Sequence, residues 1–537
     1  MTLATTQLED TIGAEMERSG LTGLAIALIK QGDIVWSNAY GTANVDTGEV
    51  LTTEMPFSIM SVTKTMISTA LMQLRDEGHF QLDDPANQYL APTRISNDFE
   101  AESPVTIRQL MTHTSGLPVL SVEGRPGKIS LDEYVNQFAR TTHRPGTEIV
   151  YANSAFVAMG VLIERFSGMG VDEYLRARIF EPLGMASARL ANPEHGDEHA
   201  TGHYRSFVDG KVRTLPLPEW STIPNSPAGG VWSTVEDVAK FVAAHLSNGG
   251  PILSRETTAE MHDLHVRQGS SPSGQGLGWR VTRSNGHKLI CHGGDGGGFT
   301  AFAGAYPEAG VGVVLLINTG AMQIARAVIG NTALEAVLGN ERKSLAVTQP
   351  LPQGTYKSTF WDIVVEARED ALVATEGLVL LGETDETTID DGNEAHGGIL
   401  HGFEVTTEGD RFFGGVYPFT FVRTGDLPSP QRIDEQADLT GTWRGTSTTP
   451  MGPLAVTITL ASETAGTIDT PFAQGLALSD CVAEKGRLAG EFAMQVPGVG
   501  NTQMFLRLEC RSGRLIGKTH ARSDFGEIAM QTDLERA

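Results

Sequence analysis

The sequence predicts an α+β domain followed by two small all-β domains. Helical and strand-like apolar spacings are mixed over about the first 345 of 537 residues, whereas the remainder reads as short strands separated by Gly and polar turns. Proline-stiffened segments at 348–353 and 427–430 divide the remainder, and each precedes a similar opening, GTYKST or GTWRGT. The predicted domains are residues 1–345, 350–426 and 437–537.

The first domain is expected to begin with a β-hairpin. The apolar runs Leu24–Ile29 and Ile34–Trp36 flank a polar turn that contains Gly32. Two strands joined by such a short turn pair with each other, so this hairpin is expected to form part of the domain's sheet.

A helix is expected after Ser61, since Ile67, Leu71 and Leu74 recur at intervals of four and three residues and form one apolar stripe. The later part of the domain combines helices with one continuous apolar run that is typical of a buried strand. These elements are helices after Ala155 and Thr234, a strand at Val311–Ile317 and a helix at Met322–Leu338.

The last domain alternates apolar and polar residues, which predicts strands with one buried and one exposed face. Leu454, Val456, Ile458 and Leu460 are each separated by one small or polar residue. A small barrel or sandwich is the fold that such strands favour.

The chain carries 40 Lys and Arg against 65 Asp and Glu, a net charge of −25. This charge repels phosphate and anionic lipid head groups, so neither nucleic acid nor a membrane surface is an expected partner. No stretch approaches the roughly 20 apolar residues needed to cross a bilayer. The N-terminus has neither a basic region nor an apolar core typical of a signal peptide.

Cysteine usage favours a cytoplasmic location. Cys291, Cys481 and Cys510 are an odd number without metal-binding spacing, so no disulfide framework is indicated, although a single Cys481–Cys510 bridge stays open. Cys291 lies next to His292 and could resemble a thiol nucleophile, but it is better explained as a small buried strand residue.

The strongest local signal for chemistry is Ser61-Val62-Thr63-Lys64. A spacing of three places Ser61 and Lys64 on one face of a helix, where the amine can reach the hydroxyl. A serine becomes nucleophilic when a base removes its proton, and a neutral amine can do so. The pattern alone is common, so it needs support from other segments.

Two further segments give that support. Tyr151 and Asn153 lie two residues apart before an apolar helix, so in an extended chain their side chains point the same way. His292 opens the run HGGDGGGF, in which glycines let a substrate lie against the strand backbone. Serine, lysine, tyrosine, amide and histidine together suit acyl transfer.

These three motifs resemble, in their order, those of the penicillin-recognising serine hydrolases, which include class C β-lactamases, DD-peptidases, class VIII esterases and D-aminopeptidases. The segments LDDP at 82–85, LMTHTSGL at 110–117 and PAGGVWS at 227–233 also look like the family. The resemblance covers about the first 345 residues and implies a β-lactamase/DD-peptidase-like antiparallel sheet flanked by helices.

The resemblance assigns roles to the motif residues. It implies that Ser61 is the nucleophile, that Lys64 and Tyr151 transfer protons, and that Asn153 orients the acyl side chain and Lys64. The oxyanion hole would be formed by the backbone N–H groups of Ser61 and Asp295. Gly293, Gly294 and Asp295 would line the substrate, next to the catalytic-site residue His292.

His292 departs from class C β-lactamases, which carry lysine at this place. A cationic lysine suits a substrate carboxylate, whereas histidine is largely neutral near pH 7, so β-lactam hydrolysis becomes less favoured. The HGG form and the two β-units resemble D-aminopeptidases, which implies two lipocalin-like, eight-stranded antiparallel barrels and a barrel loop that reaches the active site. An acid such as Asp295, Asp469 or Asp480 would then bind the substrate's free α-amine.

We therefore expect an amidase or aminopeptidase that acts on D-amino-acid amides or peptides through an acyl-enzyme on Ser61. The alternatives are a class VIII-type carboxylesterase, a peptide-cyclising acyl transferase and a non-catalytic sensor that is acylated once. The expected partner is a small-molecule or short-peptide substrate, and the resemblance suggests a homodimer.

No cofactor or metal is expected. His195, His199 and His203 recur every four residues, a spacing that could bind metal on a helix. The segment contains Gly196 and Gly202 and lies where the family has a loop and a strand, so solvated loop histidines are the better explanation.

Overall fold

The structure of the protein is a computed structural model. The structure describes residues 5–117, 130–190, 198–208, 211–216, 227–269, 273–320, 322–339, 352–358, 364–367, 371–376, 386–389, 395–396, 406–408, 411–414, 419–426, 434–449, 452–496, 500–523 and 526–537.

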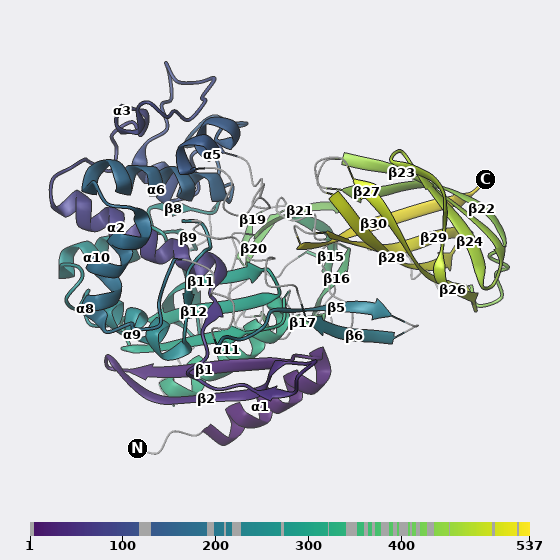
Figure 1. Cartoon of the computed structure of the whole chain (residues 1–537), viewed down its shortest axis with the longest axis horizontal. Helices are drawn as coiled ribbons and strands as arrows, with labels where there is room; N and C mark the ends of the chain where they lie inside the picture. Colours follow the sequence, from purple (N-terminus) through teal and green to yellow (C-terminus); the bar gives the residue numbers. More distant parts are fainter. Residues whose placement is uncertain are drawn as a thin grey trace. The chain divides into compact units, whose positions relative to one another are not determined.

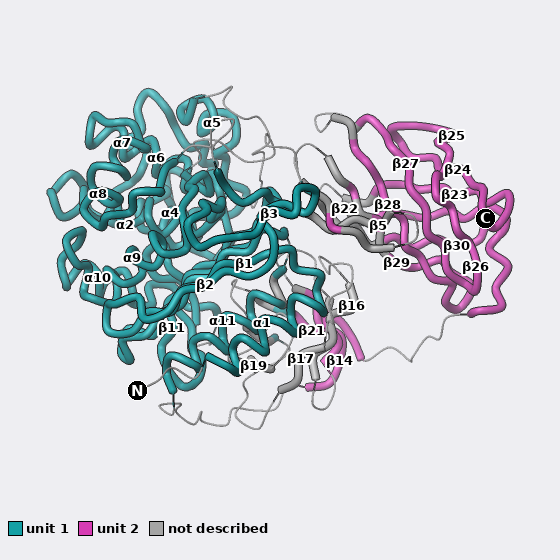
Figure 2. The backbone as a smooth tube through the Cα atoms, turned by 60° about the horizontal axis from the view of Figure 1, so that its bottom comes forward, with its two compact units in different colours: residues 1–204, 216–351, 386–421 teal, residues 205–215, 352–385, 422–537 magenta. Residues whose placement is uncertain are grey.

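The chain divides into two compact units (Figure 2). The first comprises residues 1–204, 216–351 and 386–421, and the second comprises 205–215, 352–385 and 422–537. The first unit contains every motif residue from Ser61 to Asp295. The domain boundaries expected from the sequence stay predictions.

The first unit is built on a nine-stranded sheet in the order β3-β2-β1-β13-β12-β11-β10-β9-β8 (Figure 1). The N-terminal hairpin β1–β2 pairs with the late strand β13, with Leu24 opposite Ile317, so the two ends of the domain meet inside the sheet. The strands are β1 Gly23–Lys30, β2 Asp33–Asn44, β3 Glu49–Val50, β8 Val266–Arg267, β9 Gly274–Gln275, β10 Arg280–Ser284, β11 His287–Gly296, β12 Phe299–Tyr306 and β13 Val311–Ile317.

Helices cover both faces of this sheet (Figure 1). Leu8 and Ile12 of α1 pack with Leu334 of α11 on one face, and the larger core on the other face includes α2, α6 and α9. The helices are α1 Thr5–Ser19, α2 Thr63–Asp76, α3 Asn87–Leu90, α4 Ile107–Met111, α5 Leu131–Phe138, α6 Asn153–Ser167, α7 Val171–Leu175, α8 Glu181–Leu183, α9 Val235–Leu246, α10 Arg255–His262 and α11 Gln323–Leu338. The short strands are β4 Phe57–Ser58, β5 His203–Val208, β6 Lys211–Pro216 and β7 Trp232–Ser233.

The elements predicted in the first domain are confirmed. The buried strand β13 spans the predicted residues Val311–Ile317, and α11 begins at Gln323, one residue after the predicted start. Thr234 caps α9 by accepting a hydrogen bond from the backbone N–H of Asp237.

No single described helix is long and apolar enough to cross a membrane. One bent pair of helical segments, α6 with Val171–Leu183, reaches the required length and hydropathy when the two are taken together.

The C-terminal region is all-antiparallel β structure. In the second unit the strands are ordered β25-β24-β23-β22-β30-β29-β28-β27-β26. Val456, Ile458 and Leu460 are buried on one face, as their alternation predicts. Closure of this sheet into a barrel stays a prediction. The strands are β22 Gly441–Thr449, β23 Gly452–Ser462, β24 Ala465–Thr470, β25 Ala473–Ala477, β26 Ser479–Glu484, β27 Arg487–Val496, β28 Gly500–Arg511, β29 Arg514–Ser523 and β30 Gly526–Arg536.

The described residues between 354 and 425 also form strands. β14 pairs with β15 and β15 with β16, while β17–β18 and β19–β20 are antiparallel pairs. A barrel here also stays a prediction. The strands are β14 Gly354–Ser358, β15 Val364–Ala367, β16 Ala371–Glu376, β17 Glu386–Ile389, β18 Ala395–His396, β19 Thr406–Glu408, β20 Arg411–Gly414 and β21 Phe419–Gly425.

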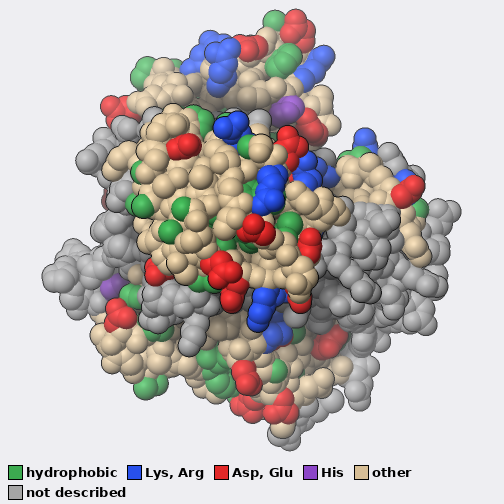
Figure 3. Space-filling model, turned by 90° about the vertical axis from the view of Figure 1, so that its right-hand side faces the viewer, with side chains coloured by type: hydrophobic (Ala, Val, Ile, Leu, Met, Phe, Trp, Pro, Cys, Tyr) green, Lys and Arg blue, Asp and Glu red, His purple; other side chains and the backbone are tan. Residues whose placement is uncertain are grey.

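Acidic and basic side chains are interspersed on the surface, as Figure 3 shows for the described part of one face. In the second unit Arg514 pairs with Asp533 at 2.8 Å and Arg511 with Glu509 at 2.6 Å. These pairs are partly exposed and screened by solvent, so they contribute little to stability. The three cysteines are buried free thiols, so no Cys481–Cys510 bridge forms.

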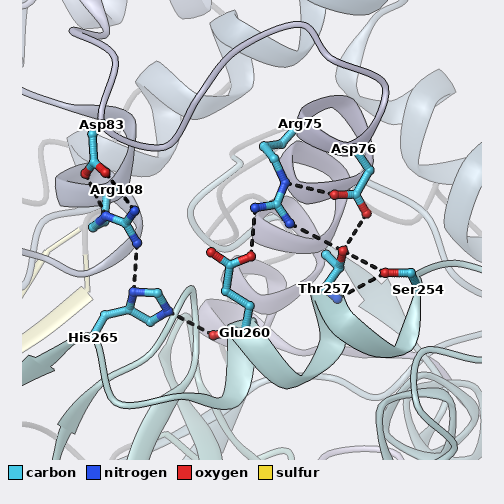
Figure 4. Close-up of polar contacts among 8 residues, drawn as sticks. All are labelled: Arg75, Asp76, Asp83, Arg108, Ser254, Thr257, Glu260 and His265. Atoms are coloured by element: carbon cyan, nitrogen blue, oxygen red, sulfur yellow. Dashed lines mark hydrogen bonds and ion pairs between the residues drawn. The ribbon is translucent and has the colours of Figure 1, made fainter.

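Polar contacts attach the C-terminal end of α2 to α10 (Figure 4). Arg75 donates to Glu260 at 2.7 Å and also contacts Asp76 and Thr257. Since Lys64 lies on the first turn of α2, these contacts hold the far end of the helix that carries it.

Two neutral histidines hydrogen-bond to each other in the core next to α2. His245 Nδ1 lies 3.1 Å from His262 Nε2, and His245 Nε2 lies 3.2 Å from Thr69 Oγ1. Trp279 packs edge-on against both rings. Burial lowers the pKa of His245 to about 3, and burial followed by the neighbouring His245 lowers the pKa of His262 well below its usual value. The folded protein therefore excludes protons that the unfolded chain binds below about pH 6.5.

We expect stability to fall as the pH is lowered from about 6.5 toward 4, by up to about 1.4 kcal/mol per pH unit for each buried histidine. Replacing His245 by Gln removes one such group and should flatten this slope. Urea unfolding at several pH values measures it, with the exposed His79→Gln as the control. An unchanged slope in His245→Gln would contradict the prediction.

Candidate functional site

Ser61 lies in a short 3₁₀ turn, Met60–Val62, directly before α2. The backbone of Met60 has φ 48°, in the left-handed region that residues other than glycine rarely adopt. Such backbone costs about 1–3 kcal/mol and persists only where the surroundings enforce it. Two hydrogen bonds hold the turn to the segment before β7: Ile59 N donates to Val231 O, and Val231 N donates to Thr63 Oγ1.

Lys64 is fully buried and reaches Ser61. Its Nζ donates to Ser61 Oγ at 2.9 Å and to the backbone carbonyl of Ala228 at 2.5 Å. The Ala228 carbonyl was not singled out from the sequence, although it lies in the PAGGVWS segment. The predicted Ser61–Lys64 proximity is what the structure shows.

Tyr151 joins this pair from a distant part of the chain. The ring centroid of Tyr151 lies 4.9 Å from Lys64 Nζ, and that of Phe156 lies 5.4 Å from it. Ala152 is extended, with φ −135° and ψ 113°, and Asn153 is the first residue of α6. Tyr151 and Asn153 therefore flank one extended residue, as the sequence indicates, and both are buried.

His113 supports Tyr151 and was quoted only as part of a family-like segment. Its ring centroid lies 4.4 Å from that of Tyr151, and its Nδ1 accepts a hydrogen bond from Ala152 N at 3.2 Å. Its carbonyl accepts from Val150 N at 2.8 Å. Burial, followed by nearby Lys64 and His292, lowers the pKa of His113 well below its usual value. His113 thus holds the residues on either side of Tyr151, Ala152 through its neutral imidazole and Val150 through its backbone carbonyl.

His292 reaches the same site from β11. Its ring centroid is 6.4 Å from that of Tyr151. Burial, followed by the Lys64 ammonium, lowers the pKa of His292 to about 3. Nδ1 lies 2.7 Å from the Gly293 carbonyl, which can only accept, so Nδ1 carries the proton and Nε2 carries a lone pair. His292 is therefore neutral near pH 7 and presents an acceptor.

Gly294 allows β11 to touch the Ser61 turn. A Cβ added at Gly294 would lie 2.4 Å from Ile59 O and 3.2 Å from Ser61 N. Real Cβ atoms do not approach backbone oxygen so closely, so only glycine permits this distance. The backbone of Gly294, the last residue of the HGG triad, consequently lies beside the backbone of Ile59 and Ser61.

The Asp295 carboxylate lies on the other face of β11. Side chains alternate along a strand, so Asp295 shares its face with Cys291 and not with His292 and Gly294. Its Oδ2 accepts from Arg326 Nη1 at 2.5 Å. This position separates the carboxylate from the Ser61 side, so an acidic contact between Asp295 and a substrate amine is not part of the function proposed below.

The other predicted acids, Asp469 and Asp480, lie in the second unit, on β24 and β26. Asp469 Oδ1 accepts from Gly475 N at 2.6 Å. Their approach to Ser61 stays a prediction.

Cys291 is buried beside His292, and burial raises the pKa of its thiol to about 12.

The repeated histidines do not form a ligand cluster in the described part of the segment. His203 Nδ1 donates to Asn318 O at 2.8 Å, and Nε2 accepts from Val45 N at 3.2 Å. His199 packs edge-on against Trp232. His195 lies outside the described residues. No three His, Cys, Asp or Glu side chains among those described are grouped to hold a metal.

A buried lysine beside a serine, an aromatic hydroxyl and a neutral imidazole define the environment of a serine hydrolase. Comparisons with known proteins agree. The family profile described as Beta-lactamase matches residues 8–335, more than half of the chain, so the chain belongs to this family. It is a beta-lactamase-family serine hydrolase that acts on amide or ester bonds.

Several relatives extend this comparison. Penicillin-binding protein 4 of Amycolatopsis lactamdurans is 30% identical over 316 residues, which cover 56% of this chain and 81% of that protein. The octameric penicillin-binding protein homologue from Pyrococcus abyssi matches 98% of this chain and 100% of its own, with TM-score 0.56 and 21% identity, and shares the fold. A D-amino acid amidase from Ochrobactrum anthropi SV3, complexed with L-phenylalanine amide, matches 63% of this chain and 100% of its own, with TM-score 0.53 and 26% identity.

Gly294→Ala should lower kcat at least tenfold, because the new methyl group must push β11 away from the Ser61 turn. Steady-state hydrolysis of p-nitrophenyl butyrate measures this effect. Gly13→Ala in α1 is the control, since an added Cβ there meets nothing within 4 Å. Wild-type kcat in Gly294→Ala would show that the close approach has no role in turnover.

His113→Ala should lower kcat about tenfold by releasing the Tyr151 segment, whereas His113→Asn should lose less, because an amide oxygen can still accept from Ala152 N. Comparing kcat and thermal stability for both variants separates positioning from folding. Equal kcat for the two variants would contradict a role for the Ala152 hydrogen bond.

Proposed function

We propose that this protein hydrolyses amides or peptides of D-amino acids through an acyl-enzyme on Ser61. The hydrogen bond from buried Lys64 to Ser61 Oγ is the observation that carries the proposal. It places a potential base at the nucleophile, in a site from which water is largely excluded.

The proposed reaction has two halves. Ser61 Oγ attacks the substrate carbonyl carbon as its proton passes to the neutral amine of Lys64, assisted by Tyr151. The resulting oxyanion accepts hydrogen bonds from the N–H groups of Ser61 and Asp295. The C–N bond then breaks, the leaving amine takes a proton through the same pair, and Ser61 keeps the acyl group as an ester. Water attacks this ester after losing a proton to the pair, and Ser61 Oγ leaves and is protonated again.

The substrate class follows from the neutral His292. A ring that presents a lone pair at Nε2 can accept from an amide N–H or a free amine, whereas it offers no positive charge to a substrate carboxylate. The similarity to a D-amino acid amidase also supports an amide substrate. β-Lactams and peptides with a free carboxylate beside the scissile bond are correspondingly poor candidates.

Further parts of the proposal concern the whole chain. We propose that the C-terminal strands close into two barrels. The proposed partner is a small molecule or short peptide, and the proposed assembly is a homodimer in the cytoplasm.

Ser61→Ala should abolish turnover and covalent labelling by a fluorophosphonate while leaving the fold intact, because only one hydroxyl is lost. Mass spectrometry of the labelled wild type should place the adduct on Ser61. Ser68→Ala, two turns further along α2, is the matched control and should keep both activities.

A panel of D-alanine p-nitroanilide, its L-isomer, p-nitrophenyl butyrate and nitrocefin identifies the substrate class. The proposal expects the D-anilide to be cleaved faster than the L-isomer, and little turnover of nitrocefin. Turnover of the ester without cleavage of either anilide would favour a carboxylesterase. Full activity of Ser61→Ala on every substrate that the wild type cleaves would reject the mechanism.

A further inference from the structure

A buried ion pair lies next to the site but takes no part in the steps above. Arg326 Nη1 on α11 is 2.5 Å from Asp295 Oδ2 on β11, and the two side chains are 2% and 8% exposed. Arg326 Nη1 also lies 3.5 Å from the Ala301 carbonyl. Apolar residues of similar volume often stabilise a core as well as a buried ion pair does. Stability alone therefore does not explain this pair, and a role in fixing the position of the strand that carries Asp295 is the alternative.

The backbone next to Asp295 is intrinsically flexible. Asp295 is the last residue but one of β11, and the turn into β12 consists of Gly296, Gly297 and Gly298 with φ 140°, 51° and 77°. Glycine in such conformations has little stiffness of its own. The position of this strand end therefore depends on contacts with other elements.

Those contacts come from the start of α11. Thr300 lies opposite Asp295 on β12, and its Oγ1 accepts from Met322 N at 3.1 Å at the beginning of α11. Arg326 holds the opposite strand through the Asp295 carboxylate. Both strands of the hairpin are thus tied to the first turns of one helix.

The ion pair acts on the Ser61 side through the backbone. Gly294 touches the Ser61 turn on one face of β11, while the Asp295 carboxylate is held on the other face. In the proposed reaction the Asp295 N–H donates to the oxyanion. A displacement of the strand end by about 1 Å would move this donor out of hydrogen-bond range.

We propose that Arg326 and the Asp295 carboxylate form a positioning pair that fixes the Asp295 N–H relative to Ser61. The proposal rests on the proposed function, because it assigns the pair to the oxyanion hole of that reaction. Neither side chain contacts the reacting atoms. Their effect is on the transition state, in which negative charge develops on the substrate oxygen.

The test is the double variant Asp295→Asn/Arg326→Met, which removes both charges and leaves neither one buried alone. We expect kcat for p-nitrophenyl butyrate to fall about 10- to 100-fold, less than or equal to the loss of a whole oxyanion donor, with KM changed less than twofold. The inhibition constant of phenylboronic acid, which forms a tetrahedral adduct with an active-site serine, should rise in the same proportion.

The matched control is Arg75→Met/Glu260→Gln, which removes an ion pair of the same unit at the far end of α2 (Figure 4). This control should lower thermal stability, but it should not show the fall in kcat at nearly constant KM that is expected for the ion-pair variant. Arg326→Lys provides a second measurement if the double variant does not fold. The shorter, single-headed ammonium reaches Asp295 only if the strand end shifts, so kcat should fall severalfold in the folded protein.

Wild-type kcat and phenylboronic acid affinity in the folded double variant, or in Arg326→Lys, would overturn the positioning role. Parallel measurements on Ser61→Ala separate the two proposals. If Ser61→Ala is inactive while the ion-pair variants match the wild type, only the positioning role fails. If Ser61→Ala retains turnover, the proposed function itself fails.

Discussion

Burial of the Lys64 amine is the constraint on which the rest of the site depends. An amine without contact with water requires acceptors for its N–H groups from the protein, and here the Ser61 hydroxyl and the Ala228 carbonyl supply them. The rings of Tyr151 and Phe156 cover the remaining approach. Because these partners come from three segments, satisfying Lys64 brings together the turn before α2, the start of α6 and the segment before β7.

Burial also determines the protonation state of the two imidazoles. It is the main cause of the lowered pKa of both His113 and His292, and positive charge on the nearby Lys64 lowers both further. Both rings therefore act as neutral hydrogen-bonding groups. One accepts from the backbone next to Tyr151, and the other, on the Ser61 side of β11, keeps a lone pair at Nε2.

Much of the fold and part of the site could be predicted from the sequence, because they depend on local spacing. The helix after Ser61, the strand Val311–Ile317 and the Ser61–Lys64 proximity follow from helical and strand periodicity. The Ala228 carbonyl and the Arg326–Asp295 pair could not be found in this way, since a backbone acceptor has no residue signature and 31 residues separate the two charges. The role of His113 could not be predicted from local spacing either, because its hydrogen bond with Ala152 joins residues 39 positions apart.

Alternation along β11 separates two sets of residues with incompatible chemistry. His292 and Gly294 face the Ser61 side, whereas Cys291 and Asp295 face α11. Inserting or deleting one residue before His292 would exchange the two faces, presenting a thiol and a carboxylate to the nucleophile and burying an imidazole against Arg326. The loop between β10 and β11 can therefore change its composition over evolutionary time far more readily than the strand can change its length.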